Sequence, residues 1–249
     1  MMTPKKLLME NQSTSRDPNS GFMVNHNRRA KAEKIMQVLD EALGDSPKLV
    51  KQRLLDIGTG NGEIAAHLAT IYDVTSVDVS DQREVNKNFK FIQLADEQLP
   101  FPERTFDIVV SNHVIEHVPS ADMHLSEIAR VLKPGGIVYL ATPNRFWPLE
   151  VHYKLYLLHW LPTEIFLRVL KKLGRYHEDV RLLGWYGLRK KAQGNFACET
   201  FSDRICKWPN RYHMNCAERT ARILGAIPLR LYRWLTWLHP TLVVVLYRR

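Results

Sequence analysis

Short apolar runs alternate with helical patterns through the first half of the chain. Five runs carry the aliphatic and β-branched residues typical of buried strands, and they lie at 53–58, 73–79, 90–95, 106–112 and 136–142. Apolar residues at helical spacing fill 63–72 and 120–132, and a similar pattern at 27–43 precedes the first run. Strands and helices in this order form right-handed crossovers, so the pattern predicts a doubly wound α/β domain with a mainly parallel sheet.

The pattern changes after residue 144. Residues 151–172 predict an apolar helix interrupted at Pro162, and 181–192 predict another helix. The run at 197–201 predicts a sixth strand, and the run at 241–249 predicts a last strand that lies antiparallel beside the fifth. These assignments divide the chain into a mobile tail at 1–24 and one domain at 25–249, with a core at 25–144 and with substrate or lid elements and the last two strands at 145–249.

Charge separates the two parts of the chain. Residues 1–144 hold 16 Lys plus Arg against 19 Asp plus Glu, whereas 145–249 hold 19 against 7, so the net charges are −3 and +12. The basic second part favours an anionic partner, which could be nucleic acid, a phospholipid surface or a phosphorylated substrate. A basic face that serves only solubility is the alternative.

Length, apolar content and cysteine usage set further bounds. The 249 residues with 45% hydrophobic content suffice for a full core. The polar first residues lack the apolar stretch typical of a secretory leader, and no apolar window reaches spanning length. The reduced thiols expected below favour the cytoplasm. The thiols Cys198, Cys206 and Cys216 match no disulfide framework and no C-x-x-C pattern. Three reduced thiols and no metal are expected, with a zinc site that includes His213 as the alternative.

The stretch LLDIGTGNGE at 54–63 places three glycines directly after the first strand. Glycines at this position let the backbone approach a ligand beyond the carboxyl end of the sheet. Asp56 precedes them and would repel a pyrophosphate, yet it suits a ligand that carries an ammonium and a sulfonium. Asp78 ends the second strand, where an acid can accept hydrogen bonds from both hydroxyls of a ribose. Together these residues favour a nucleoside without phosphates.

With these residues in place, the chain resembles the class I S-adenosylmethionine-dependent methyltransferases over residues 27–144. LLDIGTGNGE resembles the glycine-rich motif of that family, VDVS its ribose-binding acid, and LPFPERTFDIVVSNHVIEHV the stretch around its fourth strand. ARVLKPGGIVYLATPN resembles the helix and fifth strand that follow. The resemblance implies a Rossmann-like, seven-stranded and mainly parallel sheet, here with an aromatic, basic lid insertion, and S-adenosyl-L-methionine as cofactor.

The same resemblance implies roles for residues around the cofactor. Asp56 would orient the amino-acid end, Asp78 would hold the ribose, and Val79 would pack on the adenine. The adenine amino group is assigned to Asp96, Glu97 or the backbone of Ala95, because this chain reads LADEQLPF where relatives place the acid one position earlier. The remaining cofactor contacts are Gly58, Gly60 and Gly62, beside the methionyl and ribose parts, and Asn112 near the sulfonium.

Two histidines after the fourth strand are candidates for chemistry. A neutral histidine can remove the proton of a hydroxyl acceptor, since its unperturbed pKa of about 6.5 lies near the working pH. Glu116 and His117 resemble the EHV of quinone-biosynthesis O-methyltransferases, so His117 is the expected base and His113 the second candidate. In the alternative interpretation, EHV only packs the turn between strand and helix.

The second part of the chain would then select the acceptor. His152, Tyr153 and His159 are candidate acceptor contacts. Aromatic and basic residues are interleaved at 151–172 and 229–239, a mixture that suits an anionic bilayer surface, with peripheral contact on the inner face of the membrane. The same mixture could stack RNA bases, or it could be helices packed on the sheet.

Three functions agree with the sequence. The first is an enzyme that methylates a small or lipid-linked acceptor at oxygen, such as an isoprenoid quinone or a cell-envelope glycan. The second is an RNA methyltransferase, although the segment SNHV lacks the residues typical of nucleobase methylation and no RNA-binding module is recognised. The third is a protein that binds S-adenosylmethionine without turnover, against which the intact glycine motif and its two acids argue.

Overall fold

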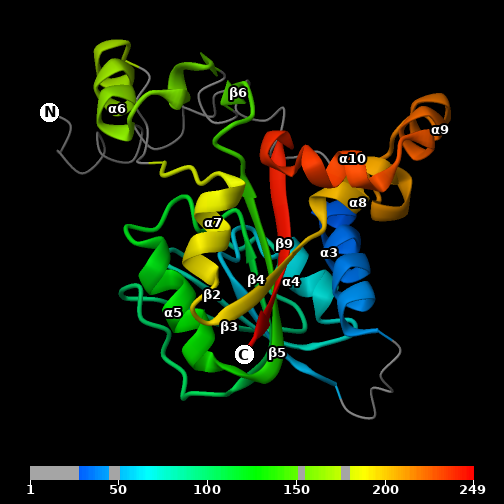
Figure 1. The fold of residues 1–249 in the computed structure, drawn as a ribbon. Coiled ribbons are helices and arrows are strands. Elements are labelled where there is room, and N and C mark those ends of the chain that lie inside the picture. Colours follow the sequence, from blue (N-terminus) through cyan, green and yellow to red (C-terminus); the bar gives the residue numbers. More distant parts are fainter. Residues whose placement is uncertain (1–27, 45–50, 151–154, 175–179) are drawn as a thin grey trace, which may run out of the picture.

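The sheet contains seven strands in the order β3-β2-β1-β4-β5-β9-β8. The computed structural model describes residues 28–44, 51–150, 155–174 and 180–249, so the predicted tail at 1–24 lies outside the described residues (Figure 1). The five strands β3 to β5 in this order are parallel, and β9 runs antiparallel to both neighbours. This order confirms the predicted doubly wound sheet and the antiparallel last strand beside the fifth. The strands are β1 (Arg53–Ile57), β2 (Asp73–Asp78), β3 (Lys90–Gln93), β4 (Phe106–Asn112), β5 (Leu132–Pro143), β8 (Phe196–Thr200) and β9 (Thr241–Arg248).

Helices cover both faces of the sheet, because apolar residues of each strand alternate between them. Leu55 belongs to the core layer beneath α5 (Ala121–Val131) and α7 (Trp185–Ala192). Its neighbour Leu54 belongs to the opposite layer, beneath α3 (Arg28–Leu43) and α4 (Glu63–Leu68). Helix α8 (Ser202–Lys207) packs on the same side as α3 through Ile205 (Figure 1).

The fifth strand is longer than its apolar run. Helix α5 ends at Val131 as predicted, but β5 starts at once with Leu132, which pairs with Phe106. Gly135, which lies between the predicted helix at 120–132 and the predicted strand at 136–142, is part of β5 with a φ of +74°, near the point where the register against β4 shifts. The correction has a local cause, since a bulge lets polar residues continue a strand pairing that their hydropathy does not predict.

Residues 145–150 and 155–174, here called the arm, follow β5 and extend beyond its carboxyl end, away from the sheet (Figure 1). The prediction of one interrupted helix is wrong for the described residues before Pro162, which form β7 and a 3₁₀ turn. Pro162 is the N-cap of the helix that follows. A small separate core of Phe166, Leu170 and Val180 holds the arm together. Its elements are β6 (Leu149–Glu150), β7 (Leu155–Tyr156), η2 (Leu158–Trp160) and α6 (Thr163–Lys172).

A second projection lies between β8 and β9. It contains η3 (Pro209–Tyr212), α9 (Glu218–Ala226), α10 (Leu229–Trp234) and η4 (Thr236–Leu238), and α10 packs on α8. Its only side-chain ion pair with α8 joins Arg233 Nε to the buried Asp203 Oδ2 at 2.9 Å, among the residues the structure describes. In the parts of the chain that are described, every helix is too short or too polar to span a bilayer.

Candidate active site

A cavity of about 340 Å³ lies at the carboxyl ends of β1, β2 and β4. This is the edge where open α/β sheets bind ligands, and the volume falls within the range of small-molecule sites. Its lining comes from the glycine-rich loop, the end of β2, the segment after β3, the loop after β4 and helix α5: Ile57, Gly58, Gly60, Val77, Asp78, Val79, Leu94, Asp96, Glu97, Leu99, His113, Val114, His117, Val118, Pro119, His124 and Glu127.

The glycine-rich loop is packed too tightly for side chains. Gly58 has a φ of +81°, and a Cβ built there would lie 2.5 Å from Cγ2 of Val114. Gly62 has a φ of +86°, and its Cβ would lie 2.0 Å from the carbonyl oxygen of Val85. Gly58 therefore borders the cavity as predicted, whereas Gly62 faces the segment after β2 and is not among the lining residues. Gly60 also lines the cavity, and its amide points to Asp78.

Asp78 occupies the predicted position at the end of β2. Its Oδ2 accepts a hydrogen bond from the amide of Gly60 at 2.9 Å, and its Oδ1 accepts one from Ser80 at 3.2 Å. The carboxylate thus joins the glycine-rich loop to the turn after β2 and lines the cavity. Val79 follows with 66% of its surface exposed, which leaves an apolar side chain open toward the same cavity.

Asp56 lies beneath the glycine-rich loop and is not among the cavity residues. It is buried, and its Oδ2 accepts a hydrogen bond from Ser76 Oγ at 2.5 Å. Ser76 in turn lies 2.5 Å from Thr59 Oγ1. Burial raises the pKa of Asp56 to about 6 despite the hydrogen bond from Ser76, and Asp78 adds to the rise. The acid therefore supports the loop from the interior of the sheet.

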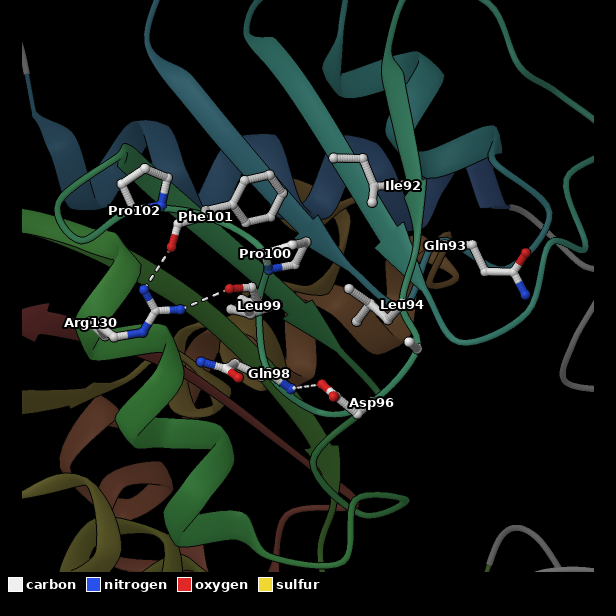
Figure 2. Close-up of a pocket in the computed structure, with 11 residues that line it drawn as sticks. Ile92, Gln93, Leu94, Asp96, Gln98, Leu99, Pro100, Phe101, Pro102 and Arg130 are labelled. Atoms are coloured by element: carbon white, nitrogen blue, oxygen red, sulfur yellow. Dashed lines mark hydrogen bonds between the residues drawn. The ribbon is translucent and has the colours of Figure 1, made fainter.

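The segment after β3 closes one end of the cavity. Asp96 and Glu97 both line it, and Asp96 Oδ1 accepts a hydrogen bond from the amide of Gln98 at 2.8 Å. A second hollow of about 590 Å³ adjoins this end and shares Asp96 with it (Figure 2). Figure 2 shows how Arg130 fixes the segment, because its guanidinium donates to the carbonyl oxygens of Phe101 at 2.6 Å and Leu99 at 2.8 Å.

The loop after β4 brings both predicted base candidates to the cavity. His113 Nδ1 lies 3.2 Å from Oε1 of Glu116, whereas His117 Nε2 lies 4.0 Å from the same oxygen. Glu116 is fully buried and accepts a second hydrogen bond from Thr142 Oγ1 at 2.9 Å. Burial raises the pKa of Glu116, but the hydrogen bond from His113 and the attraction of His113 and His117 outweigh it, so the pKa is lowered overall.

Two residues of this region differ from the sequence-based expectation. His124 of α5 was not among the candidate residues, but it lines the cavity and its Nε2 lies 3.0 Å from Ser111 Oγ. Burial lowers the pKa of His124 to about 4, so the ring is neutral, although Glu116 opposes the shift. The contact joins a strand to a helix of the folded chain, so the sequence does not reveal it. Asn112 is half-buried at the end of β4 and is not among the lining residues.

Of the three predicted acceptor contacts, His159 is the one that the structure describes, and it does not line the cavity. His159 is buried within the arm, where its Nε2 lies 2.8 Å from the carbonyl oxygen of Trp147. His152 and Tyr153 lie outside the described residues.

The thiols are half-buried and free, and burial raises the pKa values of Cys198 and Cys206 to about 11. Across the described ranges, no group of three or more His, Cys, Asp or Glu side chains is arranged to hold a metal ion.

Comparison with known proteins identifies the family. A model described as a methyltransferase domain matches residues 24–204. The chain belongs to this family. S-adenosylmethionine is the cofactor of class I methyltransferases, and the sheet order, the glycine-rich loop and Asp78 of this chain agree with that assignment.

The two curated relatives below match less than half of this chain. A ubiquinone biosynthesis O-methyltransferase of Paramagnetospirillum magneticum is 36% identical over 44% of this chain and 49% of its own length. A 27-O-demethylrifamycin SV methyltransferase of Amycolatopsis mediterranei is 33% identical over 42% of this chain and 43% of its own. The chain therefore spans about half the length of these relatives.

Solved structures support the fold over a longer stretch. The CurJ carbon methyltransferase aligns with 87% of this chain and 54% of its own, with a TM-score of 0.53 and 16% identity. At this identity the likeness shows the Rossmann-like fold alone.

Proposed function

We propose that the protein is an S-adenosylmethionine-dependent methyltransferase that methylates a hydroxyl oxygen of a small or lipid-linked acceptor. One observation carries this proposal: a single cavity is lined at one side by the glycine-rich loop with Asp78 and at the other by His113 and His117 beside a buried carboxylate. The first side suits a nucleoside, and the second suits removal of a proton.

The residues around the cavity fit the cofactor. The carboxylate of Asp78 can accept hydrogen bonds from ribose hydroxyls, and exposed Val79 offers an apolar surface for a purine ring. Asp96 or Glu97 would hold the adenine amino group. Gly58 and Gly60 give the backbone its close approach, while Asp56, with Gly62 and Asn112, would act from behind the lining by shaping the loop and the strand end.

Most of the catalysis would come from positioning. When bound, S-adenosylmethionine supplies a methyl group already activated on a sulfonium. The loop after β4 would hold the acceptor hydroxyl in line with that group, and a neutral histidine of this loop would take the hydroxyl proton. His117 and His113 are the two candidates, since both reach the cavity.

The choice of oxygen rests on these histidines and on two relatives. The ubiquinone biosynthesis relative is named as an O-methyltransferase, and the rifamycin relative acts at a 27-O position. Isoprenoid quinones and cell-envelope glycans present hydroxyl groups of this kind near a lipid phase. We therefore favour such acceptors, with the arm as a lid and with His152 and Tyr153 as proposed acceptor contacts. His159 would have to leave its buried position in the arm to become a third.

The exposed side chains of the arm and of the second projection support a function at a membrane surface. The arm exposes Leu157, Trp160 and Ile165, and the second projection exposes Ile223, Leu231 and Trp234. Exposed basic residues accompany them, namely Arg168, Lys171, Lys172, Arg219, Arg222 and Arg230. Aromatic and aliphatic side chains next to arginine and lysine suit the headgroup zone of an anionic bilayer.

Transfer of a labelled methyl group into fractionated cell extract tests the proposal. The protein is incubated with labelled S-adenosylmethionine and extract, and the lipid, glycan, RNA and protein fractions are counted separately, with the Asp78→Ala variant as control. We expect label in the lipid or glycan fraction. Analysis of the labelled product should place the methyl group on oxygen. Label only in RNA would support the second function, which the basic part of the chain favours, and cofactor binding without any label would support the third.

A further inference from the structure

Glu116 connects the loop after β4 to the next strand through both of its carboxylate oxygens. Oε2 accepts a hydrogen bond from Thr142 of β5 at 2.9 Å, and Oε1 lies 3.2 Å from His113 Nδ1. The backbone carbonyl of the same residue accepts from the amide of Arg181 at 2.8 Å. Glu116 has no exposed surface, so its orientation is fixed by these three contacts.

This arrangement determines the tautomer of His113. An ionised carboxylate only accepts hydrogen bonds, so the proton of the neutral ring must be on Nδ1. Nε2 then carries the lone pair, on the opposite side of the ring from Glu116. His113 lines the cavity with 38% of its side chain exposed, and its Nε2 has no hydrogen-bond partner among the described residues. His117 lacks this arrangement, because 4.0 Å is too long for a hydrogen bond to Glu116.

The backbone at His113 supports a special role for this side chain. Its φ is +60°, a left-handed conformation that is uncommon outside glycine, although asparagine, aspartate and histidine adopt it more often than other residues do. The amide of His113 donates to the carbonyl oxygen of Ala141 at 2.8 Å, which holds the strand end in place. A histidine kept at a strained position beside a cavity is typical of a functional site.

We propose that Glu116 is a positioning residue that presents Nε2 of His113 to the acceptor, so that His113 rather than His117 takes the hydroxyl proton. This inference rests on the proposed function. In the transfer, the oxygen–hydrogen bond of the acceptor breaks and its proton passes to Nε2, while the oxygen forms a bond to the methyl carbon. The carbon–sulfur bond of the donor breaks and its electron pair stays on sulfur. The imidazolium then returns its proton to water, and Glu116 stabilises the positive ring in the meantime.

Several charged and titratable groups surround His113 and Glu116. His117 lies on the same loop, and His124 reaches the cavity from α5 and is neutral because burial lowers its pKa. Thr142 from β5 is uncharged, and Arg181 contributes its backbone amide. The carboxylates of Asp78, Asp96, Glu97 and Glu127 also line the cavity, but among the described residues Glu116 is the carboxylate that hydrogen-bonds to the ring of His113.

The tautomer can be measured without any acceptor. Long-range ¹H–¹⁵N spectra of histidine-labelled protein distinguish Nδ1-protonated from Nε2-protonated rings, and His113→Asn assigns the signal because asparagine tolerates a positive φ. We expect the Nδ1-protonated form in the wild-type protein and a mixture in Glu116→Ala. An Nε2-protonated His113 in the wild type would overturn the positioning role, whatever the protein methylates.

Kinetics with the extract fraction that the wild-type protein labels test the second half of the inference. Glu116→Gln keeps the shape and an acceptor but removes the charge, so kcat should fall about tenfold or more while the Kd for S-adenosylmethionine stays within about twofold. His113→Asn should lose more activity than His117→Asn. Glu103→Gln, which changes an exposed glutamate that does not line the cavity, serves as the matched control.

Two kinetic results would overturn the inference: unchanged kcat in Glu116→Gln, or a greater loss in His117→Asn than in His113→Asn. A wild-type protein that labels only nitrogen or carbon contradicts the proposed function instead, and the tautomer measurement still decides the role of Glu116.

Discussion

Asp78 is the side chain on which cofactor binding depends most directly. Its carboxylate lines the cavity and is already oriented by the amides of Gly60 and Ser80. We expect Asp78→Ala to weaken S-adenosylmethionine binding by about 1.5 to 3 kcal/mol, which is the scale of lost hydrogen bonds to a charged group. Isothermal calorimetry measures this loss. Asp73→Ala, at the exposed opposite end of the same strand, should bind normally, and equal affinity in both variants would remove the ribose assignment.

Asp56 makes the stability of the protein depend on pH. Its pKa is raised from 3.8 to about 6, so the folded state binds this proton more tightly than the unfolded state does. The resulting stabilisation is fully present below pH 3.8 and is lost as the pH rises through about 6. The difference corresponds to roughly 3 kcal/mol.

Asp56→Asn should remove this dependence. Between pH 4 and pH 7, the free energy of unfolding of the wild type should fall by roughly 3 kcal/mol relative to the variant. Urea titrations of both proteins across this range measure the difference. A constant gap between the two proteins would mean that the pKa of Asp56 is not raised in the folded protein.

Among the residues near the cavity, only those that belong to a recognised sequence motif could be predicted. Gly58, Asp78 and Val79 could be predicted because each lies at or directly after the end of a predicted strand. All three line the cavity. The pairing of His113 with Glu116, and that of His124 with Ser111, depends on side-chain directions after a left-handed residue and across two elements. Hydropathy and spacing contain no information on such directions.

At the scale of elements, the glycine-rich loop fixes how the first crossover helix begins. Gly62 is the N-cap of α4, with a φ of +86° and no room for a Cβ against Val85. Gly62→Ala should therefore destabilise the protein by about 2 kcal/mol or more. Gly187 lies inside α7 with open space around it, so Gly187→Ala should stabilise by about 0.5 to 1 kcal/mol.

Thermal and urea unfolding of the two glycine variants gives the comparison. The cofactor affinity should fall in Gly62→Ala and stay unchanged in Gly187→Ala, because only the first displaces the loop under the cavity. Equal stability of the two variants would show that the loop can relax around a side chain at position 62.

The elements were predictable where one physical signal dominated. Buried parallel strands carry continuous apolar runs, so the seven strands of the sheet were found from the sequence, including the last strand between the fifth and sixth. The arm was not predicted correctly. Residues 155–161 are as apolar as the residues of a buried helix, but they form a short strand and a 3₁₀ turn. Their apolar side chains are partly exposed rather than packed on the sheet, and hydropathy does not distinguish the two situations.

At the scale of the whole molecule, the arm and the second projection lie at the carboxyl edge of the sheet, which is also the edge that holds the cavity. Helix α6 and the pair α9 and α10 both stand beyond the carboxyl end of β5, on opposite sides in the view of Figure 1. Helix α9 buries none of its residues. A bilayer that contacted both projections would face the carboxyl edge of the sheet, from which a lipid-linked acceptor could reach the cavity.

This geometry selects the side chains for a membrane-binding test. Trp234 is 69% exposed, whereas Trp237 is half-buried and its carbonyl oxygen accepts a hydrogen bond from Asn144. Substitution of Trp237 would therefore disturb the fold, and Leu231 with Trp234 is the better pair. Ile71 provides the control, since it is exposed at the opposite, amino edge of the sheet.

We expect the protein to co-sediment with anionic phosphatidylglycerol vesicles at low salt and less at high salt, because the attraction between basic residues and phosphate is screened. The double change Leu231→Ala and Trp234→Ala should reduce the partition coefficient roughly tenfold, the effect of losing about 1.4 kcal/mol of apolar burial. Ile71→Ala should bind like the wild type, and circular dichroism should show all three proteins folded. Absence of sedimentation at low ionic strength would remove the membrane from the proposed function, and loss of binding in Ile71→Ala alone would place the contact at the other edge of the sheet.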